Sequence, residues 1–315
     1  MSGVIVGFDT SNYTTSVAVL DESGALLANL KRPLTVKPGE RGLRQSDALF
    51  AHTVNLPALI EEAGVVISGR PILAVGVSDK PRNAEGSYMP CFLAGVSAAC
   101  GVSVAAGAPL YRFSHQCGHI MAALYSSGRM DLVTEPFTAL HVSGGTTEML
   151  AVTPAEHGFV TEIVGGTKDL NAGQVIDRIG VHMGFSFPAG RYIEEAALLN
   201  TAPIPRRRLA VDGCYMNLSG VENMALKIYN DTGDERLTSA FVLDFIGRSI
   251  QSACCAREAE CGRIPFVFAG GVMSNGIIKK MLSDGRDAAF AEPMLSADNA
   301  VGVAVLALSA YRAEK

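Results

Sequence analysis

The chain has no Cys-x-x-Cys motif, no excess of basic residues and no long hydrophobic run, and each absence excludes a class of protein. Its seven cysteines stand mostly in apolar surroundings, which is typical of reduced thiols in a cytosolic protein. The most apolar late stretch, residues 300–310, is too short for a membrane helix of roughly 20 residues. Asp9 interrupts the first apolar run and no basic segment precedes it, so we expect no signal peptide. These features predict a cytoplasmic protein without a membrane anchor.

The charge balance gives no general attraction to nucleic acid. The net charge is −5, from 26 basic and 31 acidic residues, so any RNA contact needs a local basic patch. The chain has one basic cluster, Arg206, Arg207 and Arg208, at the end of a Pro-rich segment. These arginines either contact RNA phosphates or form a solvated turn, and the sequence leaves both interpretations open.

Two segments of the chain share one design. Residues 4–20 predict a strand, a tight loop and a second strand, and residues 138–152 repeat this pattern about 130 residues later. With 315 residues, the chain exceeds the size at which one core usually stops growing. Strand and helix patterns also alternate along the chain. We therefore expect an α/β protein with two related lobes.

Both repeated loops can face a phosphate. The first follows Asp9 and contains Ser11, so hydroxyl and backbone N–H groups stand beside a carboxylate. The second contains Ser143, Gly144 and Gly145, and paired glycines let backbone N–H groups approach an anion closely. An ordinary β-turn and an ordinary glycine hairpin are the simpler interpretations of the two loops.

Another glycine pair, Gly270 and Gly271, ends the apolar strand pattern at residues 265–269 and precedes a helix start. A nucleotide or similar anion commonly binds where a parallel strand leads into a helix in this way. The GxGxxG spacing is missing, so the segment is not a Rossmann fingerprint.

His115 and His119 predict a metal site. They are four residues apart in a predicted helix, so both imidazoles lie on one face and can reach the same ion. An incidental pair is the alternative, and a metal needs a further ligand from elsewhere. Taken alone, Asp298 near the start of the last helix is commonly a cap, and Asp177 on another helix is commonly solvated.

These motifs resemble, in order and over nearly the whole chain, the TsaD-type tRNA N6-adenosine threonylcarbamoyltransferase family, formerly described as O-sialoglycoprotein endopeptidases. The matching motifs are Gly7-Phe8-Asp9-Thr10-Ser11, His115-x-x-x-His119, Val142-Ser143-Gly144-Gly145-Thr146-Thr147, Ala172-Gly173-Gln174-Val175-Ile176-Asp177, Phe187-Pro188-Ala189-Gly190, Asn217-Leu218-Ser219-Gly220, Ala269-Gly270-Gly271-Val272-Met273-Ser274-Asn275 and Ala297-Asp298-Asn299-Ala300. Eight motifs in one order are far more specific than any one of them.

The resemblance implies a duplicated actin/hexokinase-like (ASKHA) α/β fold with the ligand in a cleft between two lobes. Residues 1–110 would form an N-terminal actin-like lobe and residues 111–315 a C-terminal one, with the last helix packing back toward the first lobe. A protein partner or a second copy would bind through the N-terminal lobe.

The resemblance also implies the site residues. His115, His119 and Asp298 would hold one divalent metal ion, which is iron in the family, while these ligands also suit zinc or manganese. An adenylate or ATP-type ligand would contact His141, Val142, Ser143, Gly144, Gly145, Asp177, Gly190, Gly270, Gly271 and Asn275. Asp9 and Ser11 would be catalytic.

The reaction implied is transfer of a threonylcarbamoyl group from its adenylate to N6 of an adenosine in tRNA. The chain departs from the family pattern at Cys117, where a Glu is typical, and at Thr146, where a His is typical. It also has Tyr13 and Thr14 in place of an acidic pair. A non-catalytic paralogue or partner subunit of a true transferase is therefore the main alternative.

Two other enzyme classes fit the sequence less well. A metallopeptidase needs a general base beside the first histidine, and Gln116 cannot take a proton. A small-molecule kinase would use Asp9 near Mg²⁺ but would leave the histidine pair without a role. Both are weaker expectations than the transferase.

Overall fold

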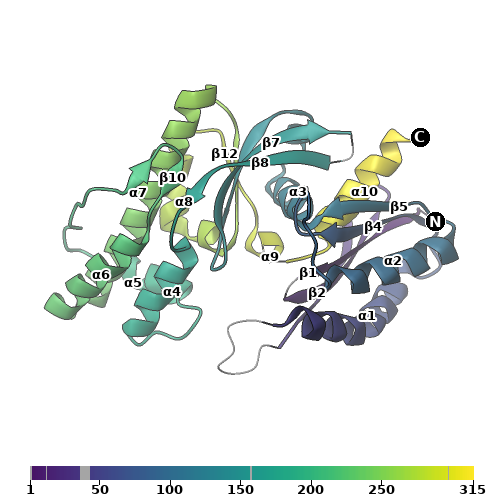
Figure 1. The fold of residues 1–315 in the computed structure, drawn as a ribbon, viewed down its shortest axis with the longest axis horizontal. Coiled ribbons are helices and arrows are strands. Elements are labelled where there is room, and N and C mark those ends of the chain that lie inside the picture. The colour runs from purple at the N-terminus through teal and green to yellow at the C-terminus, as the bar shows by residue number, and fades with distance from the viewer. Residues whose placement is uncertain (1, 12, 36–42, 157, 297) are drawn as a thin grey trace. The chain divides into compact units, whose positions relative to one another are not determined.

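The computed structural model describes residues 2–11, 13–35, 43–156, 158–296 and 298–315. The chain folds into two compact α/β units. Unit 1 comprises Met1–Val133, Pro154–Val160 and Met294–Lys315, and unit 2 comprises Thr134–Thr153 and Thr161–Pro293. Figure 1 shows the fold and labels most of the helices and strands.

Unit 1 is built on a five-stranded mixed sheet in the order β3-β2-β1-β4-β5. Its strands are β1 (Val4–Ser11), β2 (Thr14–Asp21), β3 (Leu26–Pro33), β4 (Ile72–Lys80) and β5 (Leu110–Ser114). β1 runs antiparallel to β2 and parallel to β4, and β4 is parallel to β5. β1 is buried along its whole length, as expected for a central strand with both faces covered.

Helices cover both faces of this sheet (Figure 1). α1 (Gln45–Ile67) and α2 (Phe92–Ala106) pack on one face, and α3 (His115–Ser127) and α10 (Val301–Ala313) pack together on the other. Side chains of β1 point alternately to the two faces of the sheet. Thr10 accepts a hydrogen bond from the α2 backbone on one face, whereas Gly7 lies against Ala304 of α10 on the other. Asp9, two residues after Gly7, therefore faces α3 and α10.

Unit 2 contains a seven-stranded sheet in the order β12-β11-β6-β7-β8-β10-β9. Its strands are β6 (Phe137–Val142), β7 (Thr147–Ala155), β8 (Gly158–Thr167), β9 (Val211–Asp212), β10 (Tyr215–Met216), β11 (Phe266–Ala269) and β12 (Ala288–Phe290). The helices are α4 (Ala172–His182), α5 (Gly190–Leu198), α6 (Ser219–Thr232), α7 (Glu235–Cys261) and α8 (Gly276–Ser283). Phe241, Phe245 and Ile246 place the apolar face of the long helix α7 in the core.

Short elements connect these parts. They are the 3-10 helices η1 (Met130–Thr134) and η2 (Gly271–Ser274) and the single helical turn α9 (Pro293–Ser296). No helix among the described residues is long and apolar enough to cross a membrane.

The two units repeat one strand order. The run β3-β2-β1-β4-β5 in unit 1 corresponds to β8-β7-β6-β11-β12 in unit 2. In each unit the hairpin partner is antiparallel, and two further strands are parallel to the first hairpin strand. The internal repeat predicted from residues 4–20 and 138–152 is thus confirmed.

The division of the chain differs from the expected boundary at residue 110. Residues 111–133 belong to unit 1, because β5 pairs with β4 and α3 packs against β4, β5 and α10. The last helix, α10, also belongs to unit 1, where it packs on β1 and β4. Both histidines of the predicted metal site therefore lie in the first unit.

Candidate functional site

The metal-site helix begins directly at the end of a strand. β5 ends at Ser114, whose Oγ accepts a hydrogen bond of 3.2 Å from the Cys117 N–H and so caps α3. The Gln116 N–H donates to Pro81 O at 3.0 Å, which fixes this first turn to the loop after β4. His115 consequently stands at the first position of α3 and His119 one turn later, with ring centroids 4.2 Å apart. The predicted shared face is confirmed.

Asp298 completes a cluster of three possible metal ligands. One ligand atom each from His115, His119 and Asp298 lies within 4.8 Å of the others. Asp298 Oδ1 is 3.5 Å from His115 Nε2 and 3.2 Å from His119 Nε2. Two imidazoles and one carboxylate fit a divalent iron, zinc or manganese ion. The residues present therefore suit the metal that the sequence predicted.

A close helix crossing brings Asp298 to the histidines. Gly302 of α10 lies so near α3 that an added Cβ would be 1.8 Å from Gly118 O. Gly118 stands between the two histidines on α3. Only glycine lets the two backbones approach this far, so the crossing holds the start of α10 beside the imidazoles.

Asp9 orients His115. It is fully buried, and its Oδ2 accepts hydrogen bonds from Ser78 Oγ at 2.5 Å and His115 Nδ1 at 2.8 Å. Its Oδ1 accepts from the Ser11 N–H at 2.9 Å. A carboxylate on Nδ1 fixes the imidazole ring and turns Nε2 toward Asp298. The structure thus makes Asp9, which was predicted to be catalytic, the positioning partner of a candidate ligand.

The cluster concentrates negative charge around the imidazoles. Burial lowers the pKa of His115, but the charges of Asp9 and Asp298 outweigh it and raise the pKa to about 10. Burial raises the pKa of Asp298, yet hydrogen bonds from His115 and His119 hold it well below its usual range. For Asp9, the same opposition of burial and His115 leaves the pKa lowered. Two ionised carboxylates are therefore ready to balance a divalent cation.

Ser11, the second residue predicted to be catalytic, carries a buried hydroxyl on the face of Asp9. Its exposed fraction is 2%, and its Oγ has no hydrogen-bond partner among the described residues. A buried hydroxyl without a partner is uncommon, and either a water or a ligand group can satisfy it. Tyr13, in the turn after β1, and Thr14, the first residue of β2, supply no carboxylate.

Cys117 does not join the cluster. Its thiol is buried, donates to Phe159 O at 3.4 Å and accepts from Asn83 Nδ2 at 3.3 Å. The side chain therefore ties α3 to the segment at Phe159. The departure from Glu at this position leaves the three candidate ligands together.

In unit 2, the second repeated loop forms a tight turn at the start of α4. The Ser143 N–H donates to Thr146 O at 2.7 Å, and Ser143 Oγ accepts from the Gly145 and Thr146 N–H groups. The Gly173 N–H in the first turn of α4 donates to Ser143 O at 3.2 Å. The predicted loop thus lies against a helix N-terminus, which favours anions.

The glycine pair at residues 270–271 adjoins this loop. Gly270 has φ +98°, and an added Cβ would lie 2.3 Å from Val142 O. Ala269 pairs with His141 in the parallel ladder of β11 and β6. The carboxyl ends of two parallel strands therefore bring the glycine pair at 270–271 beside His141 and Val142, as in many nucleotide sites.

Asp177 and Gly190 also meet. Asp177 Oδ1 accepts a 2.8 Å hydrogen bond from the Ala189 N–H, directly before Gly190 at the start of α5. The Phe187–Pro188 peptide bond in this loop is cis. Asp177 is thus held at the loop before Gly190, another predicted ligand contact, rather than simply solvated.

Asn275 caps a helix. Its Oδ1 accepts from the Ile277 and Ile278 N–H groups at 3.1 and 3.0 Å. Asn275 is thus the N-cap of α8. Arg206, Arg207 and Arg208 are exposed, in a segment without regular secondary structure.

Two residues near the cluster escaped the sequence analysis. Ser78 holds Asp9, and Lys31 donates to Met294 O at 2.9 Å, four residues before Asp298. In the sequence, Ser78 directly follows the apolar run at residues 72–77, and polar side chains at the carboxyl end of such a strand often serve a site. Nothing local in the sequence marks Lys31.

Solved structures share the fold. Component A of (R)-2-hydroxyglutaryl-CoA dehydratase from Acidaminococcus fermentans matches all of both chains with a TM-score of 0.54 and 15% identity. HypF from T. kodakarensis matches 99% of this chain and 48% of its own with a TM-score of 0.58 and 12% identity. The predicted actin/hexokinase-like α/β class is thereby confirmed.

Sequence relatives identify the family. Residues 34–305 match the family model described as TsaD, tRNA N6-adenosine threonylcarbamoyltransferase. Proteins of that name from Streptococcus suis (strain 05ZYH33) and Streptococcus pneumoniae (strain Taiwan19F-14) are each 30% identical to the chain over 325 aligned positions. The alignments cover 99% and 98% of this chain and 93% of each relative. The chain belongs to the tRNA N6-adenosine threonylcarbamoyltransferase family.

Proposed function

We propose that the chain transfers a threonylcarbamoyl group from its adenylate to N6 of an adenosine in tRNA. The observation that carries this proposal is the cluster of His115, His119 and Asp298 in a chain of this family. The names of the relatives supply the reaction and the acceptor. The adenylate donor and the metal anchor are the finer parts of the proposal.

The proposed reaction forms one bond and breaks one. N6 of the adenosine bonds to the carbamoyl carbon, the bond from that carbon to a phosphate oxygen breaks, and AMP leaves with the electron pair. N6 gives up one proton. When bound, the divalent ion, which we propose to be iron with zinc or manganese as alternatives, supplies a Lewis acid and a template for phosphate oxygens.

The residues of the chain bind and orient the reactants. Asp9 fixes His115, while Ser11 offers a hydroxyl on the same face. In unit 2, the glycine loop at residues 143–146 lies against the N-terminus of α4, where the helix dipole would favour a nucleotide phosphate. We assign the ribose to Asp177 and Gly190 and the base to Asn275.

A direct assay tests the proposal. The purified, metal-loaded chain is incubated with threonylcarbamoyl adenylate and unmodified tRNA, and the digested nucleosides are weighed by mass spectrometry. We expect threonylcarbamoyladenosine from the native chain and at least a hundredfold less from His119→Ala. His182→Ala, which removes a histidine of α4 outside these loops, is the matched control and retains activity. A loaded chain that binds tRNA and adenylate but forms no product would contradict the proposal.

The second candidate function is a non-catalytic partner of a transferase. It is favoured by Tyr13 and Thr14, which supply no carboxylate to orient the reacting amine. Stable co-purification with a related transferase, and product formation only in that complex, would support this alternative. Phosphorylation of a small acceptor by ATP, or cleavage of a protein that depends on His115, would revive the kinase or the peptidase.

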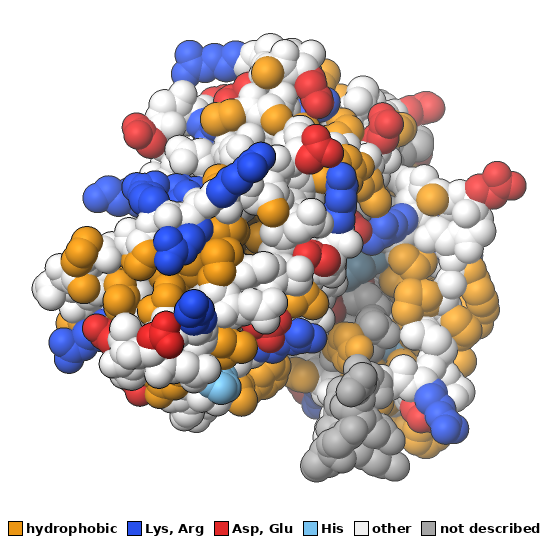
Figure 2. Space-filling model, turned by 60° about the vertical axis from the view of Figure 1, so that its left-hand side comes forward, with side chains coloured by type: hydrophobic (Ala, Val, Ile, Leu, Met, Phe, Trp, Pro, Cys, Tyr) orange, Lys and Arg blue, Asp and Glu red, His pale blue; other side chains and the backbone are white. Residues whose placement is uncertain are grey.

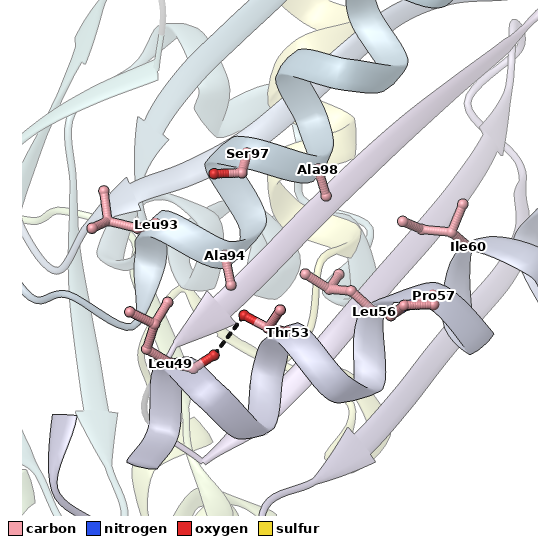
Figure 3. A pocket seen from close by; sticks show the side chains of 9 residues that line it. All are labelled: Leu49, Thr53, Leu56, Pro57, Ile60, Leu93, Ala94, Ser97 and Ala98. Carbon is pink, nitrogen blue, oxygen red and sulfur yellow. Dashed lines mark hydrogen bonds between the residues drawn. The ribbon is translucent and has the colours of Figure 1, made fainter. Parts of the chain in front are cut away.

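The helical face of unit 1 suits a protein partner. α1 and α2 enclose an apolar groove, and Figure 3 shows the side chains of both helices around it. The groove is lined by Leu49, Thr53, Leu56, Pro57, Ile60, Leu93, Ala94, Ser97 and Ala98. Phe50, Val54 and Val104 add exposed apolar surface on the same two helices. We propose that a second copy of the chain binds here, because each copy presents both the groove and the exposed apolar residues that could fill it. A related subunit is the alternative partner.

Sedimentation tests this partner surface. Leu93→Glu places a charge at the groove, where the side chain is 44% exposed and the fold tolerates it. We expect this variant to lose association while Val181→Glu, at an exposed position of α4 in unit 2, keeps it. Unchanged association of Leu93→Glu would contradict the assignment.

The acceptor RNA is assigned to a local patch. Basic and acidic side chains are interspersed on the face in Figure 2, so the surface there is not uniformly basic. We propose that Arg206, Arg207 and Arg208 contact tRNA phosphates. Replacing all three by alanine is expected to weaken tRNA binding and reduce its salt dependence. An unchanged salt dependence would contradict the patch.

A further inference from the structure

Lys31 lies on the face of the unit 1 sheet from which Asp9 projects toward the metal-ligand cluster. In the strand ladders Asp9 pairs with Ser16, and Ser16 pairs with Lys31. Residues opposite one another on neighbouring strands project from the same face. Because Asp9 reaches His115, the side chain of Lys31 extends over the same side of the sheet, two strands away.

The Lys31 ammonium is close to Asp298 but does not form an ion pair with any described carboxylate. It donates one hydrogen bond, to Met294 O at 2.9 Å. Burial lowers its pKa, and the charge of Asp298 acts in the opposite direction. An ammonium has three donors, so two remain for a ligand. A partly buried cation without a paired carboxylate is suited to an anionic ligand group.

Ser11 provides a second unused group on this face. It lies two residues after Asp9 on β1, and its buried Oγ has no partner among the described residues. A cation and a free hydroxyl beside a divalent-metal site can together bind a carboxylate and a neighbouring carbonyl or hydroxyl group. The threonylcarbamoyl group carries all of these functions.

We propose that Lys31 binds the carboxylate of the threonyl group and that Ser11 Oγ hydrogen-bonds to the same acyl portion. This inference rests on the proposed function and assigns a residue that determines acyl-group specificity. In this assignment the carboxylate of the acyl group goes to Lys31, on the sheet face that carries Asp9. A donor without the carboxylate then loses a charge-assisted hydrogen bond.

The rival explanation is structural. Lys31 also holds Met294 O, so it can support the segment that leads to Asp298. Removal of such a support would lower metal content and weaken every ligand equally. Removal of a carboxylate-binding group would weaken only ligands that carry the carboxylate.

Paired ligands separate these roles. A hydrolysis-resistant analogue of threonylcarbamoyl adenylate is compared by calorimetry with its matched analogue, in which a carboxamide replaces the threonine carboxylate. We expect the native chain to bind the carboxylate analogue about tenfold more tightly. Lys31→Met is expected to bring this ratio to about one, with metal content unchanged, and Lys31→Arg to preserve the preference.

The control is Arg32→Met, which removes the adjacent cation of β3. Arg32 pairs with Glu62 at 2.7 Å, and its variant should keep the native ratio. An unchanged ratio in Lys31→Met, or equal weakening of both analogues with loss of metal, would overturn the inference while leaving the transferase intact. Failure of the native chain to bind either analogue would contradict the proposed function and the inference that depends on it.

Discussion

At the residue scale, the candidate site depends on the buried carboxylate of Asp9, which is not itself one of the three candidate metal ligands. Asp9 holds His115 through Nδ1 and is itself held by Ser78 and the Ser11 N–H. Asp9→Asn removes the charge and one acceptor while keeping the shape. We expect metal affinity to fall about 10- to 100-fold, because partners of ligating histidines typically contribute this much. Titration with Fe²⁺ or Zn²⁺ measures it. Asp21→Asn, at the last residue of β2, is the control, and equal affinities of both variants would contradict the role of Asp9.

Substitution of Cys117, in contrast, should leave metal binding unchanged. Its thiol points to Phe159 O and Asn83, so Cys117→Ser should retain the native metal stoichiometry. Elemental analysis of the purified variant checks this, with His119→Ala as the variant that loses metal. A metal-free Cys117→Ser protein with native helix content would show that the thiol belongs to the site.

The residues of the cluster were predictable to different degrees. The pair His115 and His119 followed from helical spacing, since four residues make about one turn. Asp298 was predicted only through the family resemblance, because 179 residues separate it from His119 and no local pattern links them. The position of Lys31 depends on strand register, which is a property of the sheet and not of the neighbouring sequence.

At the scale of elements, the crossing of α3 and α10 assembles the metal cluster. Gly302→Ala would place a methyl group 1.8 Å from Gly118 O. This oxygen belongs to the backbone of α3, which cannot move aside without disturbing the helix. We expect a loss of about 2–4 kcal/mol in unfolding free energy and weaker metal binding, because the helices must separate. Urea denaturation and metal titration measure the two effects.

Gly101→Ala is the matched control for this prediction. Gly101 lies within α2, and nothing stands within 4 Å of its added Cβ. The substitution should be neutral or stabilise by about 0.5–1 kcal/mol through helix propensity. Equal stability of the two variants would show that α3 and α10 do not pack as closely as described.

The elements also show what a sequence can and cannot specify. The hairpin pattern at residues 4–20 and 138–152 predicted β1, β2, β6 and β7, since alternating apolar residues and turn residues are local signals. The unit boundary was placed at 110, whereas β5 and α3 complete unit 1. A short strand does not reveal which sheet it joins, because pairing depends on distant residues.

At the scale of the whole molecule, two units with one strand order carry different chemistry. Unit 1 holds the metal-ligand cluster and Lys31, whereas unit 2 holds the glycine loops beside the N-terminus of α4. The duplication supplies the scaffold, and the family membership supplies the expected reaction. Both must function for the proposed transfer.

The most direct test is the content of threonylcarbamoyladenosine in tRNA from cells that lack the gene, measured by mass spectrometry of nucleosides. We predict that the modification disappears, returns with the native gene and does not return with a gene that encodes His115→Ala and His119→Ala. An unchanged level of the modification in the deletion strain would contradict the proposed transferase activity.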